Sequence, residues 1–235
     1  MNGQADTGRA EFDGYAGDYD AALAQGLSVS GEDKTHFARG RVDWLAKCLA
    51  PLHQHPRAVM DFGCGTGSAT PYLLGLDGVE SLVGVDVSAK SLEVARQHYG
   101  TQRARFALFA DYQPDGRIDL AFCNGVFHHI PPADRPGALA YINRSLRPGG
   151  LFALWENNPL NPGTRYVMSR IPFDRDAITL TAGEARRLLR GAGFEIVSTD
   201  FLFIFPRMLS WCRGLEPLVS HLPLGAQYQV LGRRK

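Results

Sequence analysis

The chain carries almost no net charge. Its 235 residues include 25 Lys and Arg against 24 Asp and Glu, which gives a formal net charge of +1. Long basic runs are missing, and the basic stretch at Arg233–Lys235 is short. Proteins that bind nucleic acid usually present a basic face. We therefore expect no nucleic-acid partner.

Cysteine and histidine show no metal-binding pattern along the chain. The four cysteines, Cys48, Cys64, Cys123 and Cys212, are scattered without metal or redox spacing. We interpret Cys64 and Cys123, which fall at predicted strand ends, as small apolar residues. No histidines and carboxylates follow one another at ligand spacing. We expect no metal ion.

Long apolar runs are also missing. No stretch reaches the ~20 residues of a membrane span, and Met1–Ala10 lacks the charged and apolar parts of a signal sequence. Apolar residues make up 45% and charged residues 21%, an ordinary globular composition. We expect a cytoplasmic protein of one domain without a membrane partner; the oligomeric state is left open.

Glycine, by contrast, is concentrated where it can serve a ligand. Residues 59–67 read Val-Met-Asp-Phe-Gly-Cys-Gly-Thr-Gly, an apolar strand that enters a triple-glycine turn. Glycine tolerates φ > 0 and lets backbone approach a ligand closely. A second strand ends on Asp86, whose carboxylate suits a ribose diol. Together they predict a nucleoside-containing cofactor at the carboxyl ends of parallel strands.

The glycine spacing separates two cofactor classes. The dinucleotide fingerprint needs Gly-x-Gly-x-x-Gly or Ala, but Ser68 stands at the sixth position and the third glycine comes one place early, at Gly67. Gly63-x-Gly65-x-Gly67 preceded by Asp61 resembles motif I of class I S-adenosylmethionine (SAM)-dependent methyltransferases. The resemblance implies SAM as cofactor and S-adenosylhomocysteine as product. A SAM-binding regulator without turnover and an NAD-dependent oxidoreductase remain alternatives.

Further segments extend this resemblance over residues 57–157. Apolar strands at 105–111 and 118–124 are followed by His-His-Ile at 128–130, and Leu-Arg-Pro-Gly-Gly at 146–150 precedes a fifth strand. This order is similar to that of the small-molecule branch, including the ubiquinone-biosynthesis type. It implies methyl transfer to a small organic acceptor and a three-layer α/β/α Rossmann-like sandwich. The implied sheet has seven strands, mostly parallel, with a C-terminal antiparallel hairpin.

The resemblance also assigns roles to residues. Asp61 and the glycines would hold the methionine end of SAM, Asp86 the ribose, Val87 the adenine ring and Asp111 with Tyr112 its amino edge. Residues 12–20 resemble the N-terminal lid of this branch, whose tyrosines close over SAM and substrate. The candidate cofactor contacts are Tyr19, Asp61, Gly63, Cys64, Gly65, Gly67, Asp86, Val87, Asp111, Tyr112 and Asn124.

His128 is the candidate catalytic residue. With an unperturbed pKa near 6.5 it could take a proton from an acceptor hydroxyl, or it could line the pocket while His129 caps the turn. Glu156, after the fifth strand, could be a base, but we interpret it as a solvated loop acid. The candidate substrate contacts are Tyr15, His128, His129, Trp155 and Asn157.

The remaining pattern predicts the elements around this centre. Periodicity indicates helices near 12–19, 31–50 and 181–192, and strands at 194–205 and 226–233. Residues 1–50 would form helical lid segments, and 51–235 the SAM-binding domain. Two segments near 157–179 and 206–225 break the alternation, and we expect them to roof the acceptor pocket.

Overall fold

The structure is a computed structural model that describes residues 31–171, 174 and 177–235. The predicted aromatic helix near 12–19, with Tyr15 and Tyr19, lies outside the described residues. Within the described part, no helix is both long and apolar enough to cross a membrane.

One seven-stranded sheet forms the middle layer, in the order β3-β2-β1-β4-β5-β7-β6. The first five strands are parallel, and β7 runs antiparallel to both β5 and β6. This confirms the predicted sheet and its C-terminal hairpin. The strands are β1 (Ala58–Phe62), β2 (Ser81–Asp86), β3 (Ala104–Leu108), β4 (Ile118–Asn124), β5 (Leu146–Asn157), β6 (Phe194–Leu202) and β7 (Gln227–Arg234).

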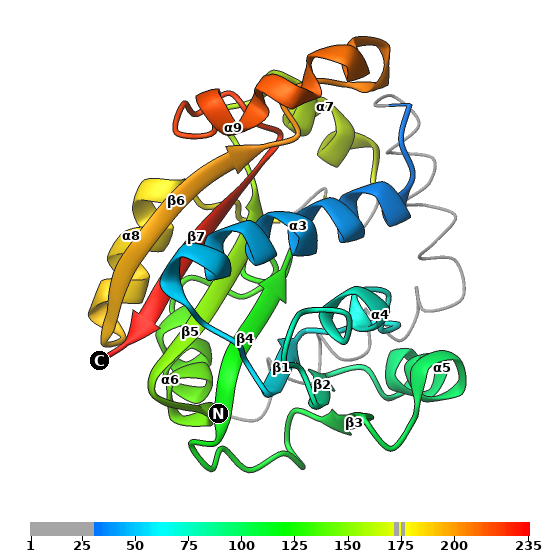
Figure 1. Ribbon diagram of the computed structural model, residues 1–235, viewed down its shortest axis with the longest axis vertical. Coiled ribbons are helices and arrows are strands. Elements are labelled where there is room, and N and C mark those ends of the chain that lie inside the picture. Colours follow the sequence, from blue (N-terminus) through cyan, green and yellow to red (C-terminus); the bar gives the residue numbers. More distant parts are fainter. Residues whose placement is uncertain (1–30, 172–173, 175–176) are drawn as a thin grey trace.

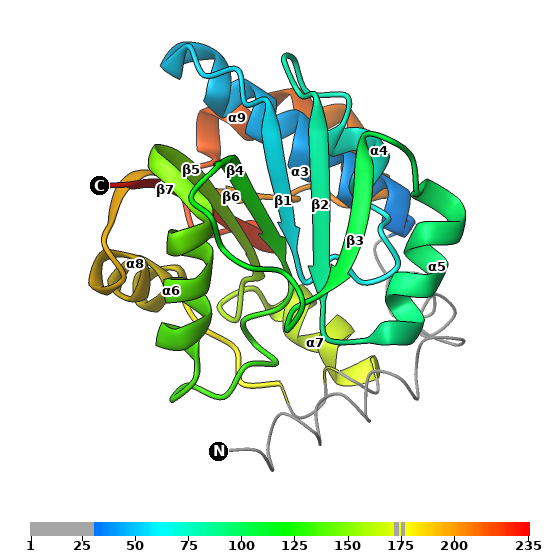
Figure 2. The ribbon, with the colours of Figure 1, turned by 90° about the horizontal axis from the view of Figure 1, so that it is seen from below.

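Helices cover both faces of the sheet (Figures 1 and 2). Helices α3 and α4 pack on one face, α6 and α8 on the other, and α5 packs against β2 and β3 at the edge. The helices are α3 (Lys34–Leu49), α4 (Thr70–Leu73), α5 (Ala89–Tyr99), α6 (Arg135–Ser145), α7 (Pro162–Arg170), α8 (Ala182–Gly191) and α9 (Glu216–Val219), with 3₁₀ helices η2 (Ala50–Leu52) and η4 (Arg207–Leu215).

Alternation along the strands explains the two cores. In β1, Val59 packs in the hydrophobic cluster between the sheet and α3, whereas its neighbour Met60 packs in the cluster between the sheet and helices α6 and α8. Successive side chains of a strand point to opposite faces, so a strand buried on both sides is apolar throughout. Local capping sets where helices begin. Thr181 and Glu184 form a reciprocal capping box at the start of α8.

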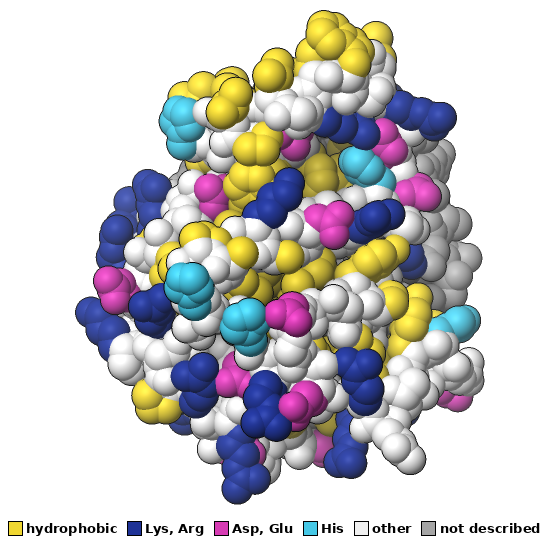
Figure 3. All heavy atoms as spheres, in the orientation of Figure 1, with side chains coloured by type: hydrophobic (Ala, Val, Ile, Leu, Met, Phe, Trp, Pro, Cys, Tyr) yellow, Lys and Arg dark blue, Asp and Glu magenta, His cyan; other side chains and the backbone are white. Residues whose placement is uncertain are grey.

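One predicted strand boundary changes, and two irregular segments contain helices. Strand β6 ends at Leu202 rather than at 205, because Phe203 adopts a left-handed backbone (φ 61°) that turns the chain out of the sheet. The two segments that interrupt the alternation also contain helices: α7 lies in the first, and η4 with α9 in the second. Figure 3 shows apolar side chains gathered over η4 and α9, where Met208 is 82% and Trp211 79% exposed.

Candidate active site

Two glycines of the turn after β1 differ in their surroundings: Gly63 is packed against a side chain, and Gly65 borders open space. Gly63, Gly65 and Gly67 all have positive φ, at 71°, 52° and 79°. A Cβ on Gly63 would lie 2.3 Å from Val126 Cγ2, whereas a Cβ on Gly65 would meet no described atom within 4 Å. Gly63 is therefore required by the protein's own packing. Gly65 leaves space beside backbone that a ligand can approach.

The end of β2 faces the same turn. The carboxylate of Asp86 accepts hydrogen bonds from the backbone N–H of Gly65 at 2.8 Å and of Ser88 at 2.9 Å. Val87 follows with 46% of its surface exposed, an apolar contact surface beside the turn. Beyond β3, Asp111 is exposed and Tyr112 half-buried. The structure thus brings Asp86 and Val87 to the glycine turn and places Asp111 and Tyr112 in the turn after β3.

Two buried polar groups suit a cationic and polar ligand. Burial and, to a smaller extent, the nearby carboxylate of Asp86 raise the pKa of Asp61 to about 7, although Arg41 opposes the shift. A ligand ammonium group would stabilise the ionised carboxylate. Asn124 Oδ1 is buried and accepts no hydrogen bond from the described residues. Cys64 belongs to a small core cluster with Phe106, and its thiol donates to the carbonyl of Gly65 at 3.7 Å.

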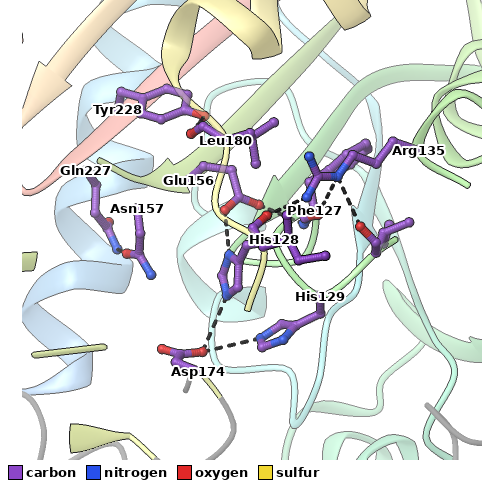
Figure 4. A network of polar contacts seen from close by, with 12 residues as sticks. Phe127, His128, His129, Arg135, Glu156, Asn157, Asp174, Leu180, Gln227 and Tyr228 are labelled. Atoms are coloured by element: carbon purple, nitrogen blue, oxygen red, sulfur yellow. Dashed lines mark hydrogen bonds and ion pairs between the residues drawn. The ribbon is translucent and has the colours of Figure 1, made fainter. Parts of the chain in front are cut away.

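Beyond β4, His128 forms a buried pair with Glu156 (Figure 4). His128 Nδ1 lies 2.6 Å from Glu156 Oε2, and Glu156 Oε1 accepts from the backbone N–H of Phe127 at 2.7 Å. The two side chains are only 3% and 1% exposed. The interpretation of Glu156 as a solvated loop acid is therefore wrong. Strand β5 stays paired with β7 through Asn157, which keeps Glu156 inside the sheet opposite Tyr228.

Asp174 joins this pair from the segment after α7. Its Oδ1 atom lies 3.4 Å from Nε2 of His128 and 3.4 Å from Nε2 of His129. Burial alone would lower the pKa of His128, but Glu156 and Asp174 outweigh it and raise that pKa to about 10. Burial would raise the pKa of Asp174, but the two histidines hold it below its ordinary value.

Backbone contacts fix the position of this cluster. The buried Arg135 donates from Nε to the carbonyls of Phe127 and Ile130, both at 3.0 Å, and from Nη2 to the carbonyl of Ile178. The N–H of Ile178 in turn donates to the carbonyl of His128 at 2.9 Å. These bonds fasten the histidine turn to the segment that carries Asp174.

A cavity of about 350 Å³ connects these groups at the carboxyl ends of β4 and β5. Its wall includes Asn124 and Gly125 at the end of β4 and both histidines with Asp174. Asn157 also lines it and accepts a hydrogen bond from Gln227 at 3.1 Å. Other lining residues come from α3, α7 and the chain after β6, among them Lys34, Phe37, Arg41, Thr164, Met168, Phe203, Phe205 and Arg213.

Trp155 lies apart from this cavity. Its side chain is fully buried in the core cluster below α3, with its ring centroid 6.4 Å from that of Phe203. Strand alternation accounts for the difference, because Trp155 and its neighbour Glu156 point to opposite faces of β5. Phe203 and Asn157 line the cavity, whereas Trp155 packs near Phe203 in the core.

Comparison with known proteins agrees with this geometry. Residues 60–154 match the family model described as a methyltransferase domain. The chain is 27% identical to the trans-aconitate 2-methyltransferase of Acidovorax sp. strain JS42, over 88% of this chain and 83% of that protein. It is 28% identical to the enzyme of the same name from Methylobacterium nodulans, over 84% and 83%.

Solved structures show the same fold. The SAM-dependent methyltransferase from Mesorhizobium loti superposes with a TM-score of 0.60 at 18% identity, over 82% of this chain and 98% of that one. The Archaeoglobus fulgidus SAM-dependent methyltransferase gives a TM-score of 0.63 at 15% identity, over 86% and 95%.

The sheet order, the glycine turn and the matched domain define a class I SAM-dependent methyltransferase. The chain is an enzyme, and SAM is its methyl donor. The NAD-dependent alternative is not supported, since the matched domain and the relatives above are methyltransferases.

Proposed function

We propose that this enzyme transfers the methyl group of SAM to a carboxylate oxygen of a small organic acid. The observation that carries the proposal is the charge of the cavity. Among the described residues, its wall holds three cations, Lys34, Arg41 and Arg213, and two carboxylates, Glu32 and Asp174. Arg213 is paired with Glu32 at 2.7 Å, and Asp174 lies beside His128 and His129. The excess of positive charge therefore lies with Lys34 and Arg41.

The relatives support an acid as acceptor. Those from Acidovorax and Methylobacterium are named for trans-aconitate, and the alignments cover 83% of each of them. At 27% and 28% identity the acid itself can differ. The proposal therefore extends to the class, a small polar acid with one or more carboxylates, and not to one compound.

The cofactor side would be held by the groups at the glycine turn. We assign the methionine end to the backbone at Gly65 and to Asp61, the ribose to Asp86 and one face of adenine to Val87. When bound, SAM supplies an electrophilic methyl group on a sulfonium centre. The backbone at Gly65 and the carboxylate of Asp86 are already joined by a hydrogen bond, so the two contacts are oriented before the ligand arrives.

The chain's other task is alignment of the acceptor. A carboxylate is already ionised and has a lone pair on oxygen, so its methylation needs no general base. This gives His128 the lining role and leaves positioning and exclusion of water as the main contributions of the protein. Correct positioning of two reactants is worth roughly 7–11 kcal/mol of barrier.

A labelled-methyl assay tests the proposal. Purified protein is incubated with methyl-labelled SAM and a panel of di- and tricarboxylic acids, phenols, quinols and amines. We expect label in acids only, as a base-labile ester. Label confined to phenols or quinols would contradict the proposal and favour the ubiquinone-type branch, to which the apolar lining from Phe37, Phe203 and Phe205 is also suited.

A charge substitution sharpens this test. Lys34→Gln removes a cation from the cavity, so the KM for the acid should rise by about 10–100-fold, as for a lost charged hydrogen bond. Lys47→Gln is the matched control, because Lys47 lies at the other end of the same helix, over the ring of Trp44. Equal KM values for the two variants would remove Lys34 from the acceptor site.

A further inference from the structure

The two histidines after β4 converge on a single carboxylate oxygen. Nε2 of His128 and Nε2 of His129 each lie 3.4 Å from Oδ1 of Asp174, and the three atoms lie within 4.8 Å of one another. The 3.4 Å separations exceed the usual length of an N–H···O hydrogen bond, about 2.7–3.2 Å. They match the edge of a tetrahedron around a cation with bonds of about 2.0–2.1 Å, which is about 1.6 times the bond length.

Glu156 orients the cluster as an outer carboxylate would. It holds Nδ1 of His128 at 2.6 Å and is itself fixed by the N–H of Phe127. Nε2 of His128 is thereby turned towards Asp174 (Figure 4). A carboxylate on the far nitrogen of a ligating histidine is the usual arrangement at metal sites, where it fixes the ring and its tautomer.

The cluster is buried yet open on one side. The side chains of His128 and Asp174 are 3% and 7% exposed and that of His129 17%. All three line the cavity that also borders Asn124 and Gly125. Three protein ligands with a remaining position towards a cavity are typical of catalytic metal sites, whereas structural sites use four protein ligands.

We propose that His128, His129 and Asp174 bind a divalent transition-metal ion of the zinc type, and that its open position takes an oxygen of the acceptor acid. Cation binding needs a lone pair on Nε2 of both histidines. The proton that Nε2 of His128 holds towards Asp174 goes to solvent, and His129 binds as the neutral imidazole with its proton on Nδ1. The ion then acts as a template that orients the acid. The sequence contains no sign of this site at ligand spacing, because Asp174 comes from a distant segment.

The acceptor part of this inference rests on the proposed function, but cation binding does not. Cation binding is measured on the full chain after removal of metal with a chelator. Co²⁺ is the probe, because its visible absorption reports nitrogen and oxygen ligands, and calorimetry gives affinity and stoichiometry. We expect one Co²⁺ per chain, displaced by Zn²⁺, and a rise in melting temperature with either ion.

Three variants test the ligands. Asp174→Asn and His129→Gln should each weaken Co²⁺ binding by at least about 100-fold, and Glu156→Gln by about 10–100-fold. His55→Gln is the control, because His55 forms an exposed pair with Asp77 at 2.7 Å on the surface. SAM binding by calorimetry should stay unchanged in Asp174→Asn, which shows that the variant is folded.

The outcomes separate this inference from the proposed function. Wild-type protein that binds no Co²⁺ and methylates acids at full rate in the presence of chelator would overturn the metal site and leave the proposed function standing. Wild-type Co²⁺ affinity in both Asp174→Asn and His129→Gln would overturn it as well. If the wild type binds one Co²⁺ that these variants lose, but methylates only phenols, the metal site would be upheld and the proposal of an acid as methyl acceptor would be rejected.

Discussion

The proposed cofactor site and the proposed acceptor site are built differently. At the cofactor site, Asp61 lies in β1, Gly65 lies in the turn that follows it, and Asp86 at the end of the neighbouring strand β2 accepts a hydrogen bond from the backbone N–H of Gly65. On the acceptor side, His128, Glu156 and Asp174 come from three segments that are far apart in the sequence, and their side chains meet in the folded protein. Local backbone positions the first group, whereas the tertiary fold positions the second.

This difference predicts which property a substitution changes. We expect Gly65 and Asp86 to contact the cofactor, so their substitution should lower SAM affinity more than it lowers the free energy of unfolding. Groups on the acceptor side are buried and paired with one another, so their loss leaves an unpaired charge inside the protein. Substitutions there should reduce stability first.

The largest effect is expected for Glu156→Ala. It removes the partner of the buried His128 side chain and of the Phe127 N–H, so the free energy of unfolding should fall by about 3–5 kcal/mol. Urea unfolding measures this loss. Glu80→Ala is the control, because Glu80 pairs with Arg57 in an exposed position, where such pairs contribute at most about 1 kcal/mol. Equal losses in the two variants would refute the contrast between buried and exposed pairs.

The glycine turn gives the sharpest test on the cofactor side. Gly65→Val places a branched side chain in open space beside the turn, at a φ of 52° that strains the turn as it does in Gly63→Val. SAM affinity should fall by at least about 100-fold, a loss of about 2.7 kcal/mol, and the sheet should persist because the new side chain meets no packed atom. Gly63→Val is the matched variant. Its Cβ would meet Val126 at 2.3 Å, so it should unfold at lower temperature.

Calorimetry with SAM and thermal unfolding of both variants decide between the two roles. Wild-type SAM affinity in Gly65→Val would show that the open space at this glycine is not part of the cofactor site. Wild-type melting temperature in Gly63→Val would show that the packing against Val126 is not needed.

The same contrast explains what the sequence could predict. The mostly parallel seven-stranded sheet and its C-terminal hairpin were expected from the resemblance of the strand and turn motifs, and they were confirmed, whereas the strand order comes from the structure. The helix predicted near 31–50 is found at Lys34–Leu49, and that near 181–192 at Ala182–Gly191. Each rests on local periodicity or on capping residues, which act within a few positions of the chain.

The acceptor side could not be predicted in the same way. Glu156 looked like a loop acid because its burial depends on the pairing of β5 with β7, more than 70 residues further along. Asp174 gave no signal, because its position depends on the hydrogen bonds of Arg135 and Ile178. If the sequence had shown that β5 extends to Asn157, alternation along the strand would have predicted that Trp155 and Glu156 face opposite sides of the sheet.

A smaller loss is expected at the ribose contact. Asp86→Ala should weaken SAM binding by roughly 1–3 kcal/mol, the cost of a lost hydrogen bond to a charged group. Asp86 also accepts from the N–H groups of Gly65 and Ser88, so part of that loss comes from the turn itself. Asp86→Asn gives an intermediate case, because its single amide oxygen keeps one of the two backbone hydrogen bonds, to Gly65 or to Ser88, while the charge is gone. An unchanged dissociation constant in both variants would exclude Asp86 as the ribose contact.

A further effect is a pH dependence that originates at Asp61. Its pKa in the folded protein is about 7, raised by burial and by Asp86. The folded state therefore keeps a proton on Asp61 in a range where the unfolded chain, with an ordinary pKa near 4, has already lost it. The contribution of Asp61 to stability thus falls as pH rises from about 4 to about 7 and is constant above. Asp61→Asn lacks this titration. The free energy of unfolding of the variant, measured with urea, should therefore rise relative to that of the wild type as the pH rises over that range.

SAM binding should respond with the opposite sign. If the ionised carboxylate of Asp61 meets the ammonium group of SAM, the affinity of the wild type should improve by about tenfold per pH unit up to about pH 7 and then level off, because below its pKa the group must first lose a proton. Asp61→Asn should bind SAM more weakly above pH 7 and show a flat profile. The difference between the two proteins isolates Asp61 from every other titrating group. Parallel profiles for wild type and variant would mean that the charge of this carboxylate takes no part in holding the cofactor, and the backbone at Gly65 would then hold the methionine end without it.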